Sequence, residues 1–311
     1  RGRNKPAEPR MVGMRRLALV ALFALSCGAL PAHAQTLSLS YKAGDTYRYG
    51  IHTALLETLT AGVLSIPIDI EITAHETVKV TAVDAAGISD LTITISDTSV
   101  KTVSKGVTST TTGLPDTSTE MKVASDGRVQ SVNGNSTAGN PFTMLTNLGG
   151  GFISAVLPDK PVKPGDTWTK TYDQTPAGGT GSVHVVARSR YLRDESVSGV
   201  STAAVETNST ATILITTGQG ALKPVIGSSG SPASGLPTGD FQSVTIKGTV
   251  VSDVTSWIDP GAHRVVKSHE SSATDATMMM TMAIAPGTSP LPALGGTFAS
   301  KGTETIDMTP A

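Results

Sequence analysis

Apolar and polar residues alternate along much of the chain after Gln35. In residues 68–72 every second position is isoleucine with an acidic residue between, and the same period of two recurs in residues 78–81 and 91–95. Successive side chains of a β-strand point to opposite faces, so each run places apolar side chains on one face and polar ones on the other. The pattern predicts an all-β protein whose strands bury one face.

Turn-forming residues separate these runs. Residues 84–87, with the sequence Asp-Ala-Ala-Gly, predict a hairpin turn, and Asp126-Gly127 is the strongest short hairpin signal in the chain. We expect a further hairpin at residues 257–261 and a charged turn at Arg193-Asp194-Glu195. These intervals are typical of a mainly antiparallel sheet.

Two stretches share the motif Gly-Asp-Thr followed by an aromatic residue, which indicates an internal duplication. Gly44, Asp45 and a threonine precede Tyr47, just as Gly165, Asp166 and a threonine precede Trp168. A hairpin turn that contains Asp and Gly, with Arg-Val after it, also follows in each half, at residues 126–129 and 259–265. We therefore divide the chain into a first β half at 35–156 and a second at 157–311, together one composite domain.

The two halves predict a curved sheet or an incomplete barrel, with one short helical crossover between them. Residues 141–156 are the single helical candidate outside the N-terminus, because Pro141 suits the first turn of a helix. Gly149, Gly150 and Gly151 are expected to break that helix into short turns.

The N-terminus has the parts of a secretory signal peptide. Met14, Arg15 and Arg16 precede an apolar run at 17–30, and small residues lead to a cleavage site after Ala34. Residues 1–34 are thus interpreted as an upstream extension and a signal peptide, and the protein as exported to the periplasm or beyond the cell. The alternative is a lipoprotein anchored at Cys27, because residues 24–27 faintly resemble a lipoprotein box.

Composition narrows the possible partners. The formal net charge is −1, which does not favour nucleic acid or an anionic membrane as a partner. No run after the signal is long and apolar enough to predict a transmembrane helix. The single cysteine, Cys27, lies in the signal, so cleavage leaves neither a disulfide nor a catalytic thiol.

Catalytic and metal-binding motifs do not emerge from the sequence, and we predict no catalytic residue, metal or cofactor. His269-Glu270 begins like a metalloprotease motif, but Ala273 stands where its second histidine belongs. Residues 227–230 form a Gly-Ser loop repeat rather than a nucleophile elbow.

Several residues are candidates for structural or binding roles. We expect Asp45 and Asp166 to cap the turns of their glycines, rather than to bind metal, and Asp126 to act likewise beside Gly127. Tyrosine often lines apolar pockets with its polar tip, tryptophan anchors a core or rim, and methionine gives an adaptable apolar lining, although thioethers also bind copper(I). The candidate ligand-binding residues are Tyr47, Tyr49, Trp168, Met278, Met280 and Met282.

Four motifs follow one another along the chain: Gly44-Asp45-Thr46-Tyr47, Val83-Asp84 with Gly87, Asp126-Gly127-Arg128-Val129, and the block at 157–168 that ends in Gly165-Asp166-Thr167-Trp168. In this order they resemble a family of exported bacterial domains of unknown function. This family has no established activity to carry over. More distantly, its members resemble the open β half-barrels of periplasmic lipoprotein and lipid carriers, which implies a carrier-like fold.

These observations predict a non-enzymatic envelope protein that binds a lipid or another apolar or amphipathic ligand on a concave sheet face. The alternative is a structural module of the envelope that docks to another protein and has no small-molecule ligand. A third hypothesis is an enzyme that hydrolyses glycans with paired carboxylates, because sequence does not show which acids converge.

Overall fold

The computed structural model describes residues 34–104, 106–133, 154–174, 179–218, 240–283 and 296–311. These residues contain twelve strands and no helix, so the all-β prediction is confirmed. The strands are β1 (Thr46–Ala61), β2 (Leu64–Val83), β3 (Ser89–Ser104), β4 (Val107–Thr111), β5 (Thr117–Val123), β6 (Val129–Asn133), β7 (Thr167–Gln174), β8 (Gly179–Val197), β9 (Val200–Gly218), β10 (Asp240–Asp259), β11 (Arg264–Ala283) and β12 (Gly296–Pro310).

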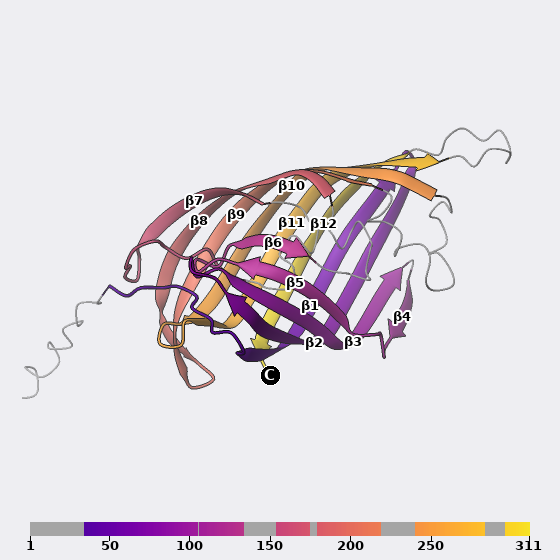
Figure 1. The fold of residues 1–311 in the computed structure, drawn as a ribbon. Helices are drawn as coiled ribbons and strands as arrows, with labels where there is room; N and C mark the ends of the chain where they lie inside the picture. The colour runs from indigo at the N-terminus through magenta and orange to yellow at the C-terminus, as the bar shows by residue number, and fades with distance from the viewer. Residues whose placement is uncertain (1–33, 105, 134–153, 175–178, 219–239, 284–295) are drawn as a thin grey trace, which may run out of the picture. The chain divides into compact units, whose positions relative to one another are not determined.

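All twelve strands belong to one antiparallel sheet with the order β6-β5-β3-β2-β1-β12-β11-β10-β9-β8-β7, and β4 pairs with β3 off this path (Figure 1). The sheet is a meander in which strands close in sequence lie side by side. Strands of the two predicted halves meet where β1 pairs with β12, in a continuous register from Tyr49 opposite Pro310 to Thr60 opposite Ala299.

The two edge strands, β6 and β7, approach each other and nearly close the sheet into a barrel. Every step along the path from β6 to β7 is antiparallel, so these two strands run in the same direction. Side chains link the edges: Gln174 Nε2 donates to the carbonyl oxygen of Val129 at 3.1 Å, and the Arg128 guanidinium lies 5.2 Å from the centre of the Tyr172 ring. The fold is an antiparallel barrel with one unsealed seam.

The inner face of the sheet is the one that carries the apolar half of each alternating run. On β2, Val78 and Val80 are almost fully buried on this face, while Lys79 between them is exposed. Their partners across the sheet, Ile93 and Leu91 on β3, are buried as well. Residues paired directly across an antiparallel ladder share a face, so the register assigns the inner side chains of every strand.

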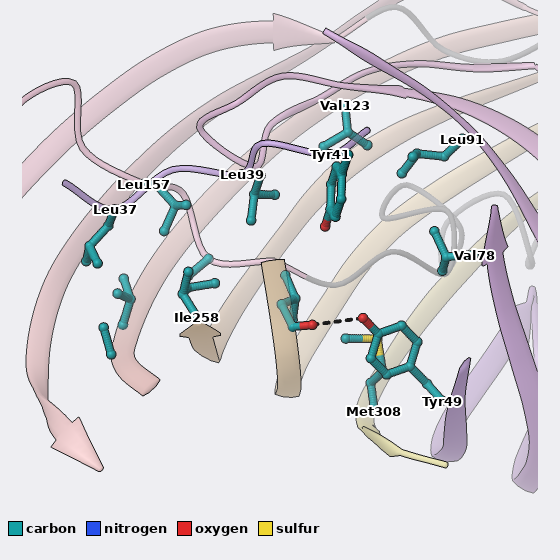
Figure 2. Close-up of a cluster of buried hydrophobic side chains, with 14 of the residues drawn as sticks. Leu37, Leu39, Tyr41, Tyr49, Val78, Leu91, Val123, Leu157, Ile258 and Met308 are labelled. Carbon is teal, nitrogen blue, oxygen red and sulfur yellow. Dashed lines mark hydrogen bonds between the residues drawn. The ribbon is translucent and has the colours of Figure 1, made fainter. Parts of the chain in front are cut away.

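Two segments outside the strands cover the inner face at one end and complete the larger core cluster. Gln35 and Val162 exchange backbone hydrogen bonds of 2.8 and 2.9 Å, and the Leu39 N–H donates to the Ser125 carbonyl. Figure 2 shows Leu37, Leu39, Tyr41 and Leu157 of these segments near Ile258, Met308 and other inner-face side chains. We call the segments 35–41 and 154–162 the plug.

One turn was predicted wrongly, and one predicted element lies outside the described residues. Strand β8 runs through residues 193–195 to Val197, and the chain reverses at Ser198 and Gly199, both with positive φ. Arg193 and Glu195 lie two residues apart on one face, where the guanidinium donates to the carboxylate at 2.9 Å, so the charge run is a polar strand face. The predicted helix at 141–156 falls largely on 134–153, outside the described residues.

Two glycines with positive φ permit a matched test of the plug. Gly127 has φ of +82° and an added Cβ would lie 2.7 Å from the Ala155 carbonyl oxygen in the plug, whereas Gly44 has φ of +97° and open space around it. We expect Gly44→Ala to reduce the free energy of unfolding by about 1–2 kcal/mol through backbone strain alone. Gly127→Ala should reduce it further, because the plug must also shift, and urea unfolding of both variants measures the difference. Equal losses would contradict this placement of the plug.

Candidate functional site

Beyond the plug, the inner face carries an apolar stripe that is only half buried. Strand β2 presents four isoleucines two residues apart, and each lies directly opposite an inner residue of β1. The four isoleucines are Ile66, Ile68, Ile70 and Ile72. Leu55 of β1 stands opposite Ile70 and is half buried too, while its outward neighbour Leu56 is 56% exposed. We call these isoleucines and Leu55 the inner apolar stripe.

The inner face turns polar on the strands that follow across the sheet. Its hydroxyl side chains include Ser189, Thr207, Ser209, Ser252, Ser256, Ser268, Ser272 and Ser300. Oxygen pairs join neighbouring strands at 2.8 Å, as between Ser209 and Ser252 and between Ser256 and Ser268. The plug is anchored to this region, because the Ala155 N–H donates to Ser256 Oγ at 2.8 Å.

Three carboxylates lie on this face on adjacent strands. Glu57 is on β1, Glu304 on β12 and Glu270 on β11, and all three are half buried. Glu304 pairs with Leu55 of β1 and with Ser272 of β11. Glu57 lies two residues from Leu55 and Glu270 lies two residues from Ser272, so each is a diagonal neighbour of Glu304. Diagonal neighbours on one sheet face are within reach of long side chains. We call these residues the acidic diagonal.

The protonation of the acidic diagonal departs from that of ordinary surface glutamates. Burial, with the charges of Glu270 and Glu57 added, raises the pKa of Glu304 to about 8. Burial raises the pKa of Glu270 to about 7, against an opposing effect of His269. It also raises the pKa of Glu57, whose carboxylate accepts a hydrogen bond from Ser300. At neutral pH Glu304 and Glu270 can therefore hold or release protons.

A fourth inner carboxyl, Glu76 of β2, lies in the larger core and not in the acidic diagonal. Its side chain is 1% exposed, it pairs across the sheet with Tyr49, and neither oxygen has a hydrogen-bond partner among the described residues. Burial raises its pKa to about 8. We infer that Glu76 is largely protonated at neutral pH.

The aromatic candidates from the sequence lie in or against the larger core. Tyr49 is 3% exposed and its hydroxyl donates to the Val265 carbonyl at 2.8 Å. Trp168 packs against the same cluster and its indole donates to the Val156 carbonyl at 2.9 Å, which fixes the plug. Tyr47 also packs there, with its hydroxyl donating to Asp45. The structure gathers these three residues around the plug, away from the inner apolar stripe.

The methionine candidates belong to β11. Met278 is 1% exposed in a second apolar cluster, together with Ile246, Ile213 and others from β8 to β11. Met280 and Met282 pair with Val244 and Phe241 through the backbone, and their side chains lie outside the described residues. The structure does not bring Met278 together with Tyr47, Tyr49 or Trp168 in one cluster.

The two Gly-Asp turns have the same local geometry. Asp45 accepts a hydrogen bond from the Lys42 N–H at 3.1 Å, and Asp166 accepts one from the Lys163 N–H at 3.0 Å. Gly44 and Gly165 have φ of +97° and +96°. Each aspartate thus stabilises its own turn, and Asp126 additionally accepts from Arg128 and Lys170.

The acidic diagonal was not predicted from the sequence, although one sequence signal points to its member Glu270. In Lys267-Ser268-His269-Glu270-Ser271-Ser272 both strand faces are polar, so the usual apolar alternation is lost. Such a run indicates a strand whose inner face is not ordinary core. Glu57 and Glu304 give no comparable signal, because their convergence depends on the pairing of β1 with β12.

Among the described residues, no group of three or more His, Cys, Asp or Glu side chains is arranged to hold a metal ion. Within those same ranges no helix has the length and apolarity needed to cross a membrane.

Comparisons with known proteins give little guidance. No protein-family model matches the chain, and no curated protein matches it. Among solved structures, the chain is similar to DynF from the dynemicin biosynthesis pathway of Micromonospora chersina, at 7% identity over 91% of this chain and 90% of that one, with a TM-score of 0.24. A likeness this distant carries no argument about fold or function.

Proposed function

We propose that this is an exported, non-enzymatic protein of the cell envelope that binds an apolar or amphipathic ligand on the inner face of its barrel. The observation that carries the proposal is the inner apolar stripe, where isoleucines and Leu55 face inward and remain half buried. Elsewhere on the same face, apolar side chains such as Val78 and Ile258 are fully buried.

The energetics of apolar surface support a ligand at the stripe. Each square ångström of apolar surface removed from water contributes roughly 25 cal/mol, so a chain laid along four isoleucines and a leucine gains several kcal/mol. Sites for small molecules are concave and mostly apolar, with a few polar groups that orient the ligand. The stripe beside the acidic diagonal has this composition.

The proposals of export and of a non-enzymatic role rest on the sequence. The signal-like segment before Gln35 supports export, and the chain carries no recognised nucleophile or phosphate-binding motif. Raised carboxyl pKa values also occur at catalytic sites. Here the carboxyls with raised pKa values lie beside an apolar stripe, an arrangement that is consistent with ligand binding.

Consecutive residues of β1 provide a matched test. Leu55→Gln places an amide on the inner face, whereas Leu56→Gln places the same amide on the outer face, where Leu56 is already 56% exposed. We expect Leu55→Gln to weaken binding of the neutral fluorescent probe N-phenylnaphthylamine by about tenfold or more, because an unpaired amide opposes apolar contact. Leu56→Gln should stay within about twofold of the parent protein.

Thermal unfolding of both variants verifies that each is folded at the assay temperature. Equal affinity of the two variants for the probe would remove the inner face as the site. Failure of the parent protein to bind the probe or any lipid would instead favour the envelope interaction module.

A further inference from the structure

We propose that the acidic diagonal receives the ammonium group of an amphipathic ligand, a primary amine whose apolar chain lies along the inner apolar stripe. This inference rests on the proposed function and names the chemical class of the ligand. It begins from the position of Glu57, Glu270 and Glu304 on three adjacent strands of one face.

The carboxylates have no cationic partner among the described residues. None of the three forms an ion pair there, and Lys301, the lysine of β12, pairs with Asp275. His269, adjacent to Glu270 in sequence, points to the outer face and pairs with Asp307. Three half-buried acids without a counter-charge are unfavourable in the ionised form, and a bound cation would relieve this.

Two largely buried residues with unpaired hydroxyls lie next to the carboxylates and point independently to a ligand. Ser272 lies directly opposite Glu304 across the β11–β12 ladder, and Thr53 of β1 lies diagonal to it; each is 8% exposed. Neither hydroxyl has a hydrogen-bond partner in the part of the chain that the structure describes. Only the Glu76 oxygens are both inaccessible and unpaired among the described residues, so the Ser272 and Thr53 oxygens stay accessible and can accept a hydrogen bond from a bound ligand.

The neighbouring strand supplies the apolar part of the site. Glu57 stands directly opposite Ile68, and Thr53 stands directly opposite Ile72. The carboxylate and the hydroxyl on β1 each therefore have an isoleucine of β2 as their neighbour. A ligand with a charged end at Glu304 thus meets the inner apolar stripe within one strand spacing of about 5 Å. The juxtaposition fits an amphipathic molecule better than a free ion or a wholly apolar one.

A primary ammonium fits this set of carboxylates and hydroxyls better than a quaternary ammonium does. An ammonium has three N–H donors, which match carboxylate and hydroxyl acceptors. A quaternary ammonium donates no hydrogen bond and is usually held by aromatic rings. Phe298 is the inner-face aromatic residue of β12, and it lies six residues along the strand from Glu304.

The test compares four ligands of equal chain length with the full-length protein: dodecylamine, dodecanol, dodecanoate and dodecyltrimethylammonium, each below its micelle concentration. We expect the amine to displace N-phenylnaphthylamine at least about tenfold more effectively than the alcohol or the trimethylammonium compound, because charge-assisted hydrogen bonds are lost in the latter two. Dodecanoate should bind weakest, because it carries the charge of the site.

Glu304→Gln should remove the preference for the amine while leaving the alcohol within about twofold, since glutamine keeps the size of the side chain. The control is Glu120→Gln, an exposed glutamate on β5, which should retain the preference. Equal binding of amine and alcohol, or a preference that survives Glu304→Gln, would overturn the ammonium site and leave apolar binding intact. Equal binding of the amine and its trimethylated analogue would overturn the hydrogen-bonded ammonium. Binding of none of the four ligands would overturn the proposed function itself.

Discussion

Asp126→Ala is expected to lower the free energy of unfolding by about 3–5 kcal/mol, because it leaves a buried lysine without its main counter-charge. The side chains of Asp126 and Lys170 are 10% and 11% exposed, and Lys170 Nζ lies 2.6 Å from Asp126 Oδ2. Arg128 Nε donates to the same oxygen at 2.7 Å. After the substitution, Lys170 keeps only Asp159, which is 83% exposed.

The position of this ion pair explains the expected size. Asp126 precedes β6 and Lys170 belongs to β7, the two edges of the sheet. Among the described residues no backbone hydrogen bond joins β6 to β7, so side chains hold the seam together. Loss of Asp126 therefore weakens barrel closure as well as one local contact.

The matched control is Asp90→Ala, which removes the partner of Lys122 in an exposed ion pair. That variant should lose about 1 kcal/mol or less. Burial alone acts to raise the pKa of Asp126, but the hydrogen bonds and charges of Lys170 and Arg128 outweigh it and hold the pKa below the ordinary value. A depressed pKa stabilises the folded state above the unfolded pKa, so the difference between Asp126→Ala and the parent should shrink as pH falls below about 4. Equal losses in the two aspartate variants at pH 7 would contradict the seam account.

The second large effect is a fall in stability with rising pH caused by Glu76. Its pKa is raised from 4.5 to about 8 by burial in the core. For an acid with a raised folded pKa, folding is not opposed below the unfolded pKa, and stability is lost progressively as pH rises toward the folded pKa. One pKa unit corresponds to about 1.4 kcal/mol, so about 4–5 kcal/mol is lost between pH 4.5 and pH 8.

Glu76→Gln isolates this contribution, because the amide stays neutral and nearly keeps the shape of the protonated acid. We expect the variant to match the parent within about 1 kcal/mol at pH 4.5 and to exceed it by about 4 kcal/mol at pH 9. Urea unfolding at both pH values measures the difference, with the exposed Glu120→Gln as the control. A gap between variant and parent that is the same at both pH values would show that Glu76 titrates normally.

The strand content was predictable from the sequence because local rules determine it. Period-two alternation in residues 68–72 and 91–95 corresponds to inner and outer faces of β2 and β3. The Asp126-Gly127 signal corresponds to a reversal between β5 and β6 with φ of +82° at Gly127. Each of these features depends on residues a few positions apart.

A curved sheet or incomplete barrel was predicted, but the strand pairing that nearly closes it and the candidate site were not, because they depend on contacts across the whole chain. Glu57 and Glu304 converge through the β1–β12 register, which joins opposite ends of the described chain. The charge run at 193–195 failed as a turn signal, because two paired charges also form a polar strand face. The positions of the aromatic candidates were not predictable either. The polar atoms of Tyr49 and Trp168 donate hydrogen bonds to backbone carbonyls, and no local sequence pattern specifies these partners.

Native mass spectrometry tests most directly whether the inner face binds an amphipathic ligand. The protein would be purified from a bacterial periplasm and measured before and after solvent extraction, with Leu55→Gln and Leu56→Gln treated in parallel. We predict a discrete added mass that extracts with the amphiphiles, persists in Leu56→Gln and is reduced in Leu55→Gln. A clean ligand-free mass, unchanged after incubation with envelope lipids and with long-chain amines, would contradict it.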